Sequence, residues 1–252
     1  MLHFDDIVFG PIFSRRLGTS LGLNILPPQG KLCNFDCVYC ECGWNKDGKS
    51  AGEFPRLVQV AEALEKRLKE LAEEGVSVDS ITFSGNGEPT MNPDFAPIVD
   101  AVLELRGKYC PNAKVSVLSN ATLAWRDDVC QALAKVDNPI LKLDAGTTDA
   151  ALAVNKPVGA YSVERVVESL RRFKGNFVLQ TMFVRSEEFD TTAPDVLGRW
   201  VEIVRELAPR EIMIYTIDRE TPDKTLQKYT VEEMASFVQP LREDGFEIQI
   251  RG

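Results

Sequence analysis

The sequence has little histidine, no long apolar run and no excess of positive charge, and each absence excludes a class of protein. His3 is the single histidine in 252 residues, so catalytic triads and histidine-rich zinc sites are almost excluded. No apolar run approaches the ~18 residues of a membrane span, and the acidic start MLHFDDIVFG does not resemble a secretion signal. The net charge of −9 argues against bulk attraction to nucleic acid or anionic lipid. We therefore expect a cytoplasmic protein with neither a membrane nor a nucleic acid as partner.

The six cysteines are distributed unevenly. Four lie within ten residues, at Cys33, Cys37, Cys40 and Cys42. Disulfides normally join distant loops, whereas clustered cysteines in a reducing compartment favour metal ligation. Cys110 and Cys130 stand alone, and we expect them to be small buried apolar residues.

Apolar periodicity predicts alternating strands and helices. Strands are expected at residues 21–26, 79–85, 114–120, 139–146, 176–184, 211–217 and 246–250. Helices are expected between them, and capping-box patterns occur at Thr192–Asp195 and Thr230–Glu233. About six such alternations are typical of an α/β fold with a parallel sheet and outer helices, open or closed into a partial barrel. We expect a single domain over residues 1–252, with function at the C-terminal ends of the strands.

Two chemical patterns overlap in residues 33–50, CNFDCVYCECGWNKDGKS. Its last eight residues satisfy the phosphate-loop pattern G-x4-G-K-[ST]. That loop works only when a buried strand leads into it and a helix follows its lysine directly. Here the preceding residues are rich in cysteine and no helical period begins before Pro55. We therefore interpret residues 43–50 as a solvated loop.

The cysteines of this stretch favour an iron–sulfur cluster. Cys33, Cys37 and Cys40 are spaced C-x3-C-x2-C, and thiolates are the usual ligands of such clusters. Three ligands leave one iron of a 4Fe–4S cluster open to bind a small molecule. Cys42 is available as a fourth ligand, but it follows Cys40 so closely that it would strain a compact loop. A closed zinc site is the alternative, although zinc ligands usually come as two separated pairs.

The segment SGNGEPT follows the second expected strand. Gly85 and Gly87 would let the main chain approach a ligand closely, and Glu88 could accept a hydrogen bond from an ammonium group. A tight turn is the simpler interpretation of the same residues, because glycine and proline interrupt many loops.

Polar residues also mark the later strands. The residues of interest are Ser119, Asn120, Lys142, Asp144, Gln180 and Met182. Short polar side chains after strands can bind ribose hydroxyls, but helix caps and Asx-turns are equally common uses. Within strands, Lys142 shares a face with Asp144, as Gln180 does with Met182, which suits a barrel lumen that holds a ligand.

Together these motifs resemble the radical S-adenosylmethionine (SAM) superfamily. There an aromatic residue precedes the third cysteine, as Tyr39 does here, and a Gly-Gly-Glu-Pro motif holds the amino group of SAM. The segment from Gly85 to Pro89 is similar to that motif, with Asn86 in place of the first glycine. The segments FGPIFSRRLGTSLGLN, SGNGEPT and VLSNAT resemble a compact iron–sulfur oxidoreductase branch related to wyosine-synthesis enzymes. Those enzymes carry a second cluster, for which this chain has no second set of cysteines.

The resemblance implies a partial (β/α)6 barrel with a cluster loop at residues 30–52, a 4Fe–4S cluster on the three cysteines, and SAM. A flavodoxin- or ferredoxin-type one-electron donor would reduce the cluster. SAM cleavage would then give a 5′-deoxyadenosyl radical, which abstracts hydrogen from an unidentified small-molecule or peptide substrate. The residues expected at the cofactors are Tyr39, Gly85, Asn86, Gly87, Glu88, Ser119, Asn120, Asp144, Gln180 and Met182.

Two other functions stay open: a tRNA-modifying radical SAM enzyme, against which the acidity argues, and a non-catalytic iron–sulfur or zinc protein. Four arginines are candidates for binding an anionic group of the substrate: Arg15, Arg16, Arg185 and Arg219. Trp44 and the loop 44–52 are a candidate lid.

Overall fold

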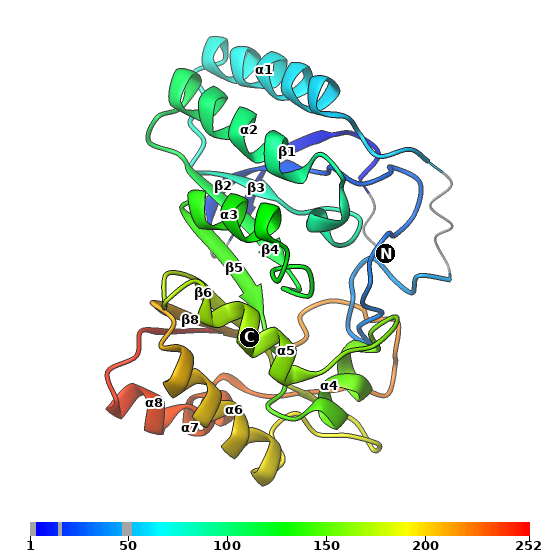
Figure 1. Cartoon of the computed structure of the whole chain (residues 1–252), viewed down its shortest axis with the longest axis vertical. Helices are drawn as coiled ribbons and strands as arrows, with labels where there is room; N and C mark the ends of the chain where they lie inside the picture. Colours follow the sequence, from blue (N-terminus) through cyan, green and yellow to red (C-terminus); the bar gives the residue numbers. More distant parts are fainter. Residues whose placement is uncertain (1–3, 15–16, 47–51) are drawn as a thin grey trace.

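Eight strands form one curved sheet (Figure 1). The computed structural model describes residues 4–14, 17–46 and 52–252. In chain order the strands of this sheet are β1 (Val8–Ser14), β2 (Gly18–Leu23), β3 (Ser80–Phe83), β4 (Lys114–Ser119), β5 (Asn138–Lys142), β6 (Val178–Met182), β8 (Glu211–Tyr215) and β10 (Ile248–Arg251). They are hydrogen-bonded in that order, all parallel except β1, which pairs antiparallel with β2.

Helices cover the outer face of the sheet (Figure 1). They are α1 (Leu57–Glu73), α2 (Phe95–Tyr109), α3 (Asp127–Lys135), α4 (Thr148–Asn155), α5 (Val163–Arg171), α6 (Pro194–Leu207), α7 (Val231–Phe237) and α8 (Gln239–Glu243), with a 3-10 turn, η1 (Pro89–Met91). Alternate strand residues such as Leu21, Ile81 and Val115 join the apolar core with the helices. Since side chains alternate across a strand, the residues between them face the inside of the curved sheet.

The inner face is more polar than the outer face. Ser20, Thr82, Ser80 and Ser116 form a buried row of hydroxyl groups across β2, β3 and β4, with successive oxygen–oxygen distances of 2.8, 3.0 and 3.0 Å. This row satisfies polar groups that would otherwise be costly to bury. The lumen therefore has polar walls, as the polar strand residues predicted.

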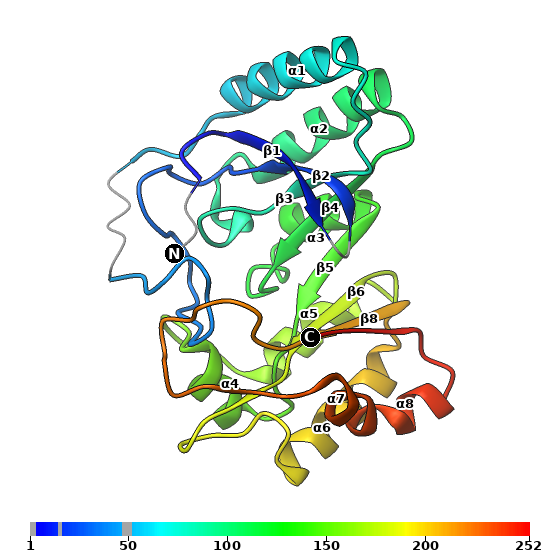
Figure 2. The same cartoon turned by 180° about the vertical axis from the view of Figure 1, so that it is seen from behind.

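The predicted partial barrel is confirmed. β1 and β10 lie at opposite ends of the sheet and, within the described residues, are not hydrogen-bonded to each other (Figure 2). The capping box at Thr230 and Glu233 is also confirmed. The one expected at Thr192 is wrong: α6 begins after Ala193 without a side-chain cap, and the Thr192 hydroxyl is bonded to Asp190 and Tyr229 instead.

The sequence reading missed β1, α4 and a small antiparallel pair of β7 (Val184–Arg185) with β9 (Gln227–Lys228). None of the helices in the described residues is both long and apolar enough to span a bilayer.

Candidate functional site

The loop that carries the cysteines follows β2 and lies along the C-terminal ends of the parallel strands. In Figure 1 it is the blue segment beside α4. Main-chain bonds attach it to α4: the N–H of Asp36 donates to Asn155 O at 2.9 Å, and that of Val38 donates to Val154 O at 3.0 Å. On the other side, Leu32 forms a β-bridge with Gly87. The loop is thus fixed between the strand ends and a helix.

Four cysteines of this loop line one cavity of about 280 Å³: Cys33, Cys37, Cys40 and Cys42. In the described parts of the chain, no three His, Cys, Asp or Glu side chains surround a position for a single metal ion. A zinc ion would need its thiolates about 2.3 Å from one point. In an iron–sulfur cluster each thiolate binds a different iron, so ligands spread around a cavity fit that group better.

The pKa values of the cysteines and of the lysine beside them are shifted from their ordinary values. Burial raises the pKa of Cys33, and it raises that of Cys37 to about 11. A hydrogen bond from Cys42, with Lys31 nearby, lowers the pKa of Cys40. Burial alone would lower the pKa of Lys31, but the cysteine sulfurs and Asp36 outweigh it and raise the pKa. The loop therefore provides positive charge where thiolates would form.

Cys42 differs from the other three cysteines. Its sulfur lies 3.5 Å from the main-chain oxygen of Gly85, toward which the thiol can donate, and Cys40 is the other acceptor that its single S–H can serve instead. Cys42 borders the same cavity as the other three cysteines, but it is the one whose thiol donates to the main chain of the SGNGEPT segment.

The SGNGEPT segment packs against the cysteine loop. A Cβ at Gly87, whose φ is +144°, would lie 1.8 Å from the main-chain oxygen of Leu32, and one at Gly85 would lie 2.5 Å from the Asn24 side chain. A close contact with a ligand was expected at these glycines, but their close neighbours are other parts of the chain. Both glycines also border the cavity. Asn86 is fully buried and bonds Phe4 and Pro28, so its side chain is not part of the cavity wall.

Glu88 is an internal acceptor at this wall. Its carboxylate accepts from Thr90 N at 3.1 Å, Thr90 Oγ1 at 2.5 Å, Ser119 Oγ at 2.8 Å and Asn120 N at 2.7 Å. Burial raises the pKa of Glu88, against these hydrogen bonds, which lower it. Asn120 in turn donates to Asn34 Oδ1 at 2.6 Å and lies 3.8 Å from Cys33 Sγ. The carboxylate thus joins the ends of β3 and β4 to the cysteine loop.

Asp144 holds the opposite side of the loop. It accepts from the Tyr39 hydroxyl, from Asn155 Nδ2 at 2.6 Å and from Met182 N at 2.9 Å, and it lies 3.8 Å from Lys142 Nζ. Asp144 and Tyr215 outweigh the effect of burial and raise the pKa of Lys142. Asp144 is 2% exposed and is not part of the cavity wall. The structure therefore gives it a bracing position, in contrast to the expected contact with ribose.

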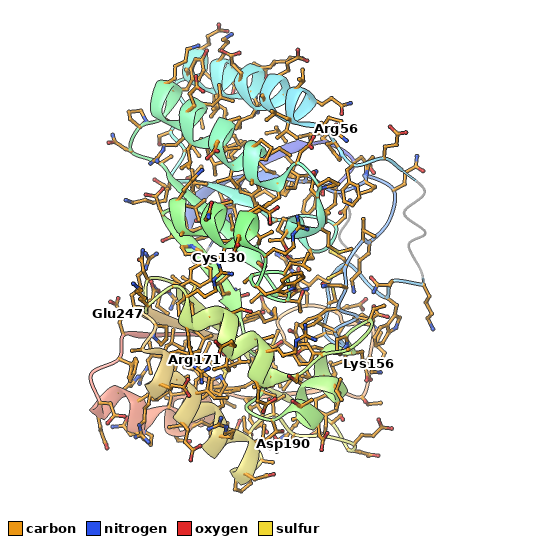
Figure 3. All side chains as sticks on the ribbon, in the orientation of Figure 1. Arg56, Cys130, Lys156, Arg171, Asp190 and Glu247 are labelled. Carbon is orange, nitrogen blue, oxygen red and sulfur yellow. The ribbon has the colours of Figure 1, made fainter. Side chains whose placement is uncertain are left out.

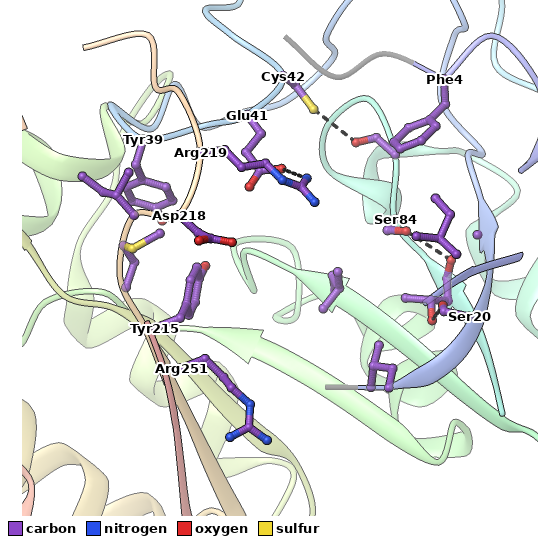
Figure 4. A pocket seen from close by; sticks show the side chains of 18 of the residues that line it. Phe4, Ser20, Tyr39, Glu41, Cys42, Ser84, Tyr215, Asp218, Arg219 and Arg251 are labelled. Atoms are coloured by element: carbon purple, nitrogen blue, oxygen red, sulfur yellow. Dashed lines mark hydrogen bonds and ion pairs between the residues drawn. The ribbon is translucent and has the colours of Figure 1, made fainter. Parts of the chain in front are cut away.

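The remaining predicted residues face the cavity. They are Tyr39, Ser119, Asn120, Gln180 and Met182. A second cavity of about 390 Å³ adjoins the first and shares Tyr39, Cys42 and Met182 with it (Figure 4). Its rim includes Arg219, which forms a 2.6 Å ion pair with Glu41.

Other expectations have mixed outcomes. Cys130 is buried in α3, away from the loop (Figure 3), whereas Cys110 is only partly buried.

The arginines expected to bind an anionic group also differ from one another. The Cζ atom of Arg185 lies over the Tyr229 ring, 4.6 Å from its centre. Arg15 and Arg16 lie outside the described residues, as do half of the phosphate-loop pattern and most of the candidate lid. Within the described residues, the next helix along the chain, α1, begins at Leu57.

Three residues at the site were missed by sequence reasoning: Lys31, Asn155 and Tyr215. Asn155 contacts the loop at Cys37 and Tyr39 from more than 110 positions away, and Tyr215 accepts from Lys142, 73 positions before it, so no local pattern could mark them. Lys31 lies two residues before Cys33, so a positive charge beside the thiolates could have been predicted from the sequence.

Comparisons with known proteins agree with this geometry. The family model described as the radical SAM superfamily matches residues 29–197. A UPF0026 protein of Synechocystis sp. is 31% identical over 228 residues, which are 88% of this chain and 78% of that protein. A protein named GTPase Obg from Brachyspira hyodysenteriae is 28% identical over 90% of this chain, which spans only 32% of that protein.

Solved structures share the fold at low identity. A radical SAM methyltransferase from Sphaerobacter thermophilus has a TM-score of 0.69 at 16% identity, over 95% of this chain and 67% of that one. SuiB of Streptococcus suis bound to S-adenosylmethionine has a TM-score of 0.64 at 17% identity, over 90% of this chain and 49% of that one. TYW1 with a lysine-pyruvate adduct has a TM-score of 0.60 at 15% identity, over 91% and 75%. TYW1 is thus one neighbour among several, and the likeness does not single out a wyosine-related branch.

The family model covers two thirds of the chain, including the cysteine loop and the ends of β3, β4, β5 and β6 at its cavity. Proteins of this superfamily are enzymes of radical chemistry that typically use a 4Fe–4S cluster and SAM. The chain belongs to the radical SAM superfamily.

Proposed function

We propose that this chain is a radical SAM enzyme that holds a 4Fe–4S cluster on Cys33, Cys37 and Cys40. The observation that carries the proposal is the single cavity that these three cysteines share with the strand ends after β3 and β4. When bound, the cluster and SAM would supply reductive cleavage to methionine and a 5′-deoxyadenosyl radical, which abstracts hydrogen from the substrate.

The chain's own residues keep the site rigid and dry. Tyr39 and Asp144 tie the cysteine loop to β5, and Asn155, 3.4 Å from Cys37 Sγ, ties it to α4. Their burial excludes water from the side of the loop that faces the sheet. Exclusion of water protects a reactive species from side reactions and keeps the target bond in position.

SAM would lie against the main chain of Gly85 and Gly87, with Gln180 and Met182 on the facing wall. Glu88 would act mainly by fixing this wall, because its carboxylate already accepts four hydrogen bonds. The contacts with SAM are assigned to groups that border the cavity and whose polar atoms can still form hydrogen bonds with a ligand.

The substrate would occupy the second cavity, which adjoins the first (Figure 4). One side of it is apolar, with Phe4, Phe9 and Leu17, and the other carries Arg219, Arg251 and Asp218. A small molecule or a peptide with apolar and polar parts matches these walls. The electron would come from an external one-electron donor of the flavodoxin or ferredoxin type.

The cysteines give the direct test. After anaerobic reconstitution we expect about four irons and four sulfides per chain, lost in Cys33→Ala, Cys37→Ala and Cys40→Ala. Cys42→Ala is the matched control and should keep the cluster, since the single S–H of Cys42 can donate to Gly85 O or to Cys40 and the thiol is not needed as a ligand. Metal analysis, absorbance and formation of 5′-deoxyadenosine from SAM measure this.

Stoichiometric zinc without iron–sulfur absorbance, or loss of the cluster in Cys42→Ala but not in Cys33→Ala, would refute the ligand assignment. If the cluster is found on the three cysteines, a screen of metabolite extracts for substrate-dependent formation of 5′-deoxyadenosine would identify the substrate. Tight RNA binding that weakens steeply with salt would instead favour a tRNA-modifying enzyme.

A further inference from the structure

Lys31 buries a charged side chain inside the cysteine loop. The side chain is 1% exposed, and its Nζ donates to Asp36 Oδ1 at 3.1 Å and to Gly43 O at 3.0 Å. Lys31 also borders the cavity of the cysteines, and, after the hydrogen bond from Cys42, its positive charge helps to lower the pKa of Cys40. Two acceptors in the loop thus hold the ammonium in place beside the cysteines.

The shape of the loop does not depend on this charge alone. Asn45 closes the same turn: its N–H donates to Asp36 Oδ1 at 2.8 Å, and its Nδ2 donates to Cys33 O and Phe35 O, each at 3.1 Å. A neutral side chain at position 31 would leave these bonds in place. Closure of the loop therefore does not by itself explain why a charged side chain is buried at position 31.

We propose that Lys31 sets the reduction potential of the cluster, acting through Cys40 and touching no substrate; the proposal rests on the function proposed above. Reduction adds a negative charge to the cluster. A fixed positive charge beside a ligand sulfur stabilises the reduced form more than the oxidised form, and the weak screening of a buried site strengthens this effect. Lys31 therefore makes the cluster easier to reduce.

Asp36 attenuates this effect without cancelling it. Its side chain is 25% exposed, against 1% for Lys31, so solvent screens the carboxylate more than the ammonium. Removal of each charge should consequently shift the potential in opposite directions.

The test is a redox titration of the anaerobically reconstituted full chain, followed by electron paramagnetic resonance. At the wild-type midpoint, Lys31→Met should lower the ratio of reduced to oxidised cluster at least tenfold, about 59 mV for a one-electron couple. Lys31→Arg should restore most of this ratio, because it keeps the charge. Asp36→Asn, which keeps an acceptor oxygen for Asn45, should raise the ratio. Lys135→Met, on the exposed side of α3, is the matched control and should leave it unchanged.

An unchanged midpoint in Lys31→Met at full iron content would overturn the proposal, as would equal shifts in Lys31→Met and Lys31→Arg. If Lys31→Met binds no cluster, Asp36→Asn decides, and an unchanged or lower midpoint there overturns the proposal. A wild-type chain that binds no cluster would refute the proposed function itself, which separates the two failures.

Discussion

The two walls of the cysteine cavity use their polar side chains differently. On the wall after β3 and β4, the Glu88 carboxylate accepts four hydrogen bonds from within the protein. On the wall formed by β6, Gln180 is only 6% exposed, yet within the described residues its amide makes no side-chain hydrogen bond. Both residues were expected to bind cofactor, Glu88 from the SGNGEPT segment and Gln180 from its place within a strand that faces the lumen. The first has little bonding capacity left for a ligand, and the second keeps all of it.

This difference separates residues that build the site from residues that are available to a ligand. A buried polar group without a partner costs free energy, typically about 1–3 kcal/mol, unless a ligand or water satisfies it. Glu88 and Asp144 avoid that cost through internal donors, so we expect their loss to affect folding first. Gln180 has no such internal partner within the described residues, but its amide borders the cavity, where water or a ligand can satisfy it, so we expect its loss to affect binding first.

The largest expected effect is at Asp144. Asp144→Asn removes the carboxylate 3.8 Å from Lys142 Nζ and leaves the ammonium buried without a counterion. Loss of one member of a buried pair typically costs about 3–5 kcal/mol, and we expect about 3 kcal/mol here, because the tyrosine hydroxyls still accept from Lys142. Urea unfolding of the apo chain measures this loss. Asp100→Asn, in an exposed ion pair with Lys135, should change stability by less than ~1 kcal/mol, and equal losses in the two variants would contradict the bracing role.

A smaller loss is expected from Glu88→Gln. The new NH2 group would face a donor, either Asn120 N or the donors around Oε1, and would leave one of them unsatisfied at a cost of about 1–3 kcal/mol.

Glu88 also predicts a dependence on pH. Burial raises its pKa in the native chain, so the native state binds more protons than the unfolded state between the unfolded and native pKa values. Stability from this group is therefore greatest at low pH and falls as pH rises through that window. The apo Glu88→Gln variant should lack this part of the pH dependence, and parallel stability–pH curves for the two proteins would contradict it.

The sequence predicted the parts of the site that depend on local spacing. The order of strands and helices followed from apolar periodicity, and the cysteine triplet lies within eight residues, so both could be read directly. β1 was missed because Gly10 and Pro11 interrupt its alternation, where the pairing with β2 is irregular between Phe9 and Ile12. α4 was missed because its eight residues, TDAALAVN, carry small side chains and no clear apolar stripe.

The roles of Glu88 and Asp144 could not be read in the same way. The donors to Glu88 from Ser119 and Asn120 lie 31 and 32 positions later, and Tyr39 is 105 positions from Asp144. A sequence shows that such residues are polar and follow a strand. Only the fold shows which of them already have partners.

The smallest expected change in stability, and the sharpest test of the comparison, is at Gln180. Gln180→Met keeps the length and most of the volume of the side chain and breaks no hydrogen bond within the described residues, so stability should change by less than ~1 kcal/mol. Binding of SAM to the reconstituted chain should weaken by up to about tenfold, the value of one typical hydrogen bond. Anaerobic equilibrium dialysis and urea unfolding measure the two quantities on the same samples. A loss of stability as large as that of Glu88→Gln, with SAM binding unchanged, would show that the two walls do not differ as argued.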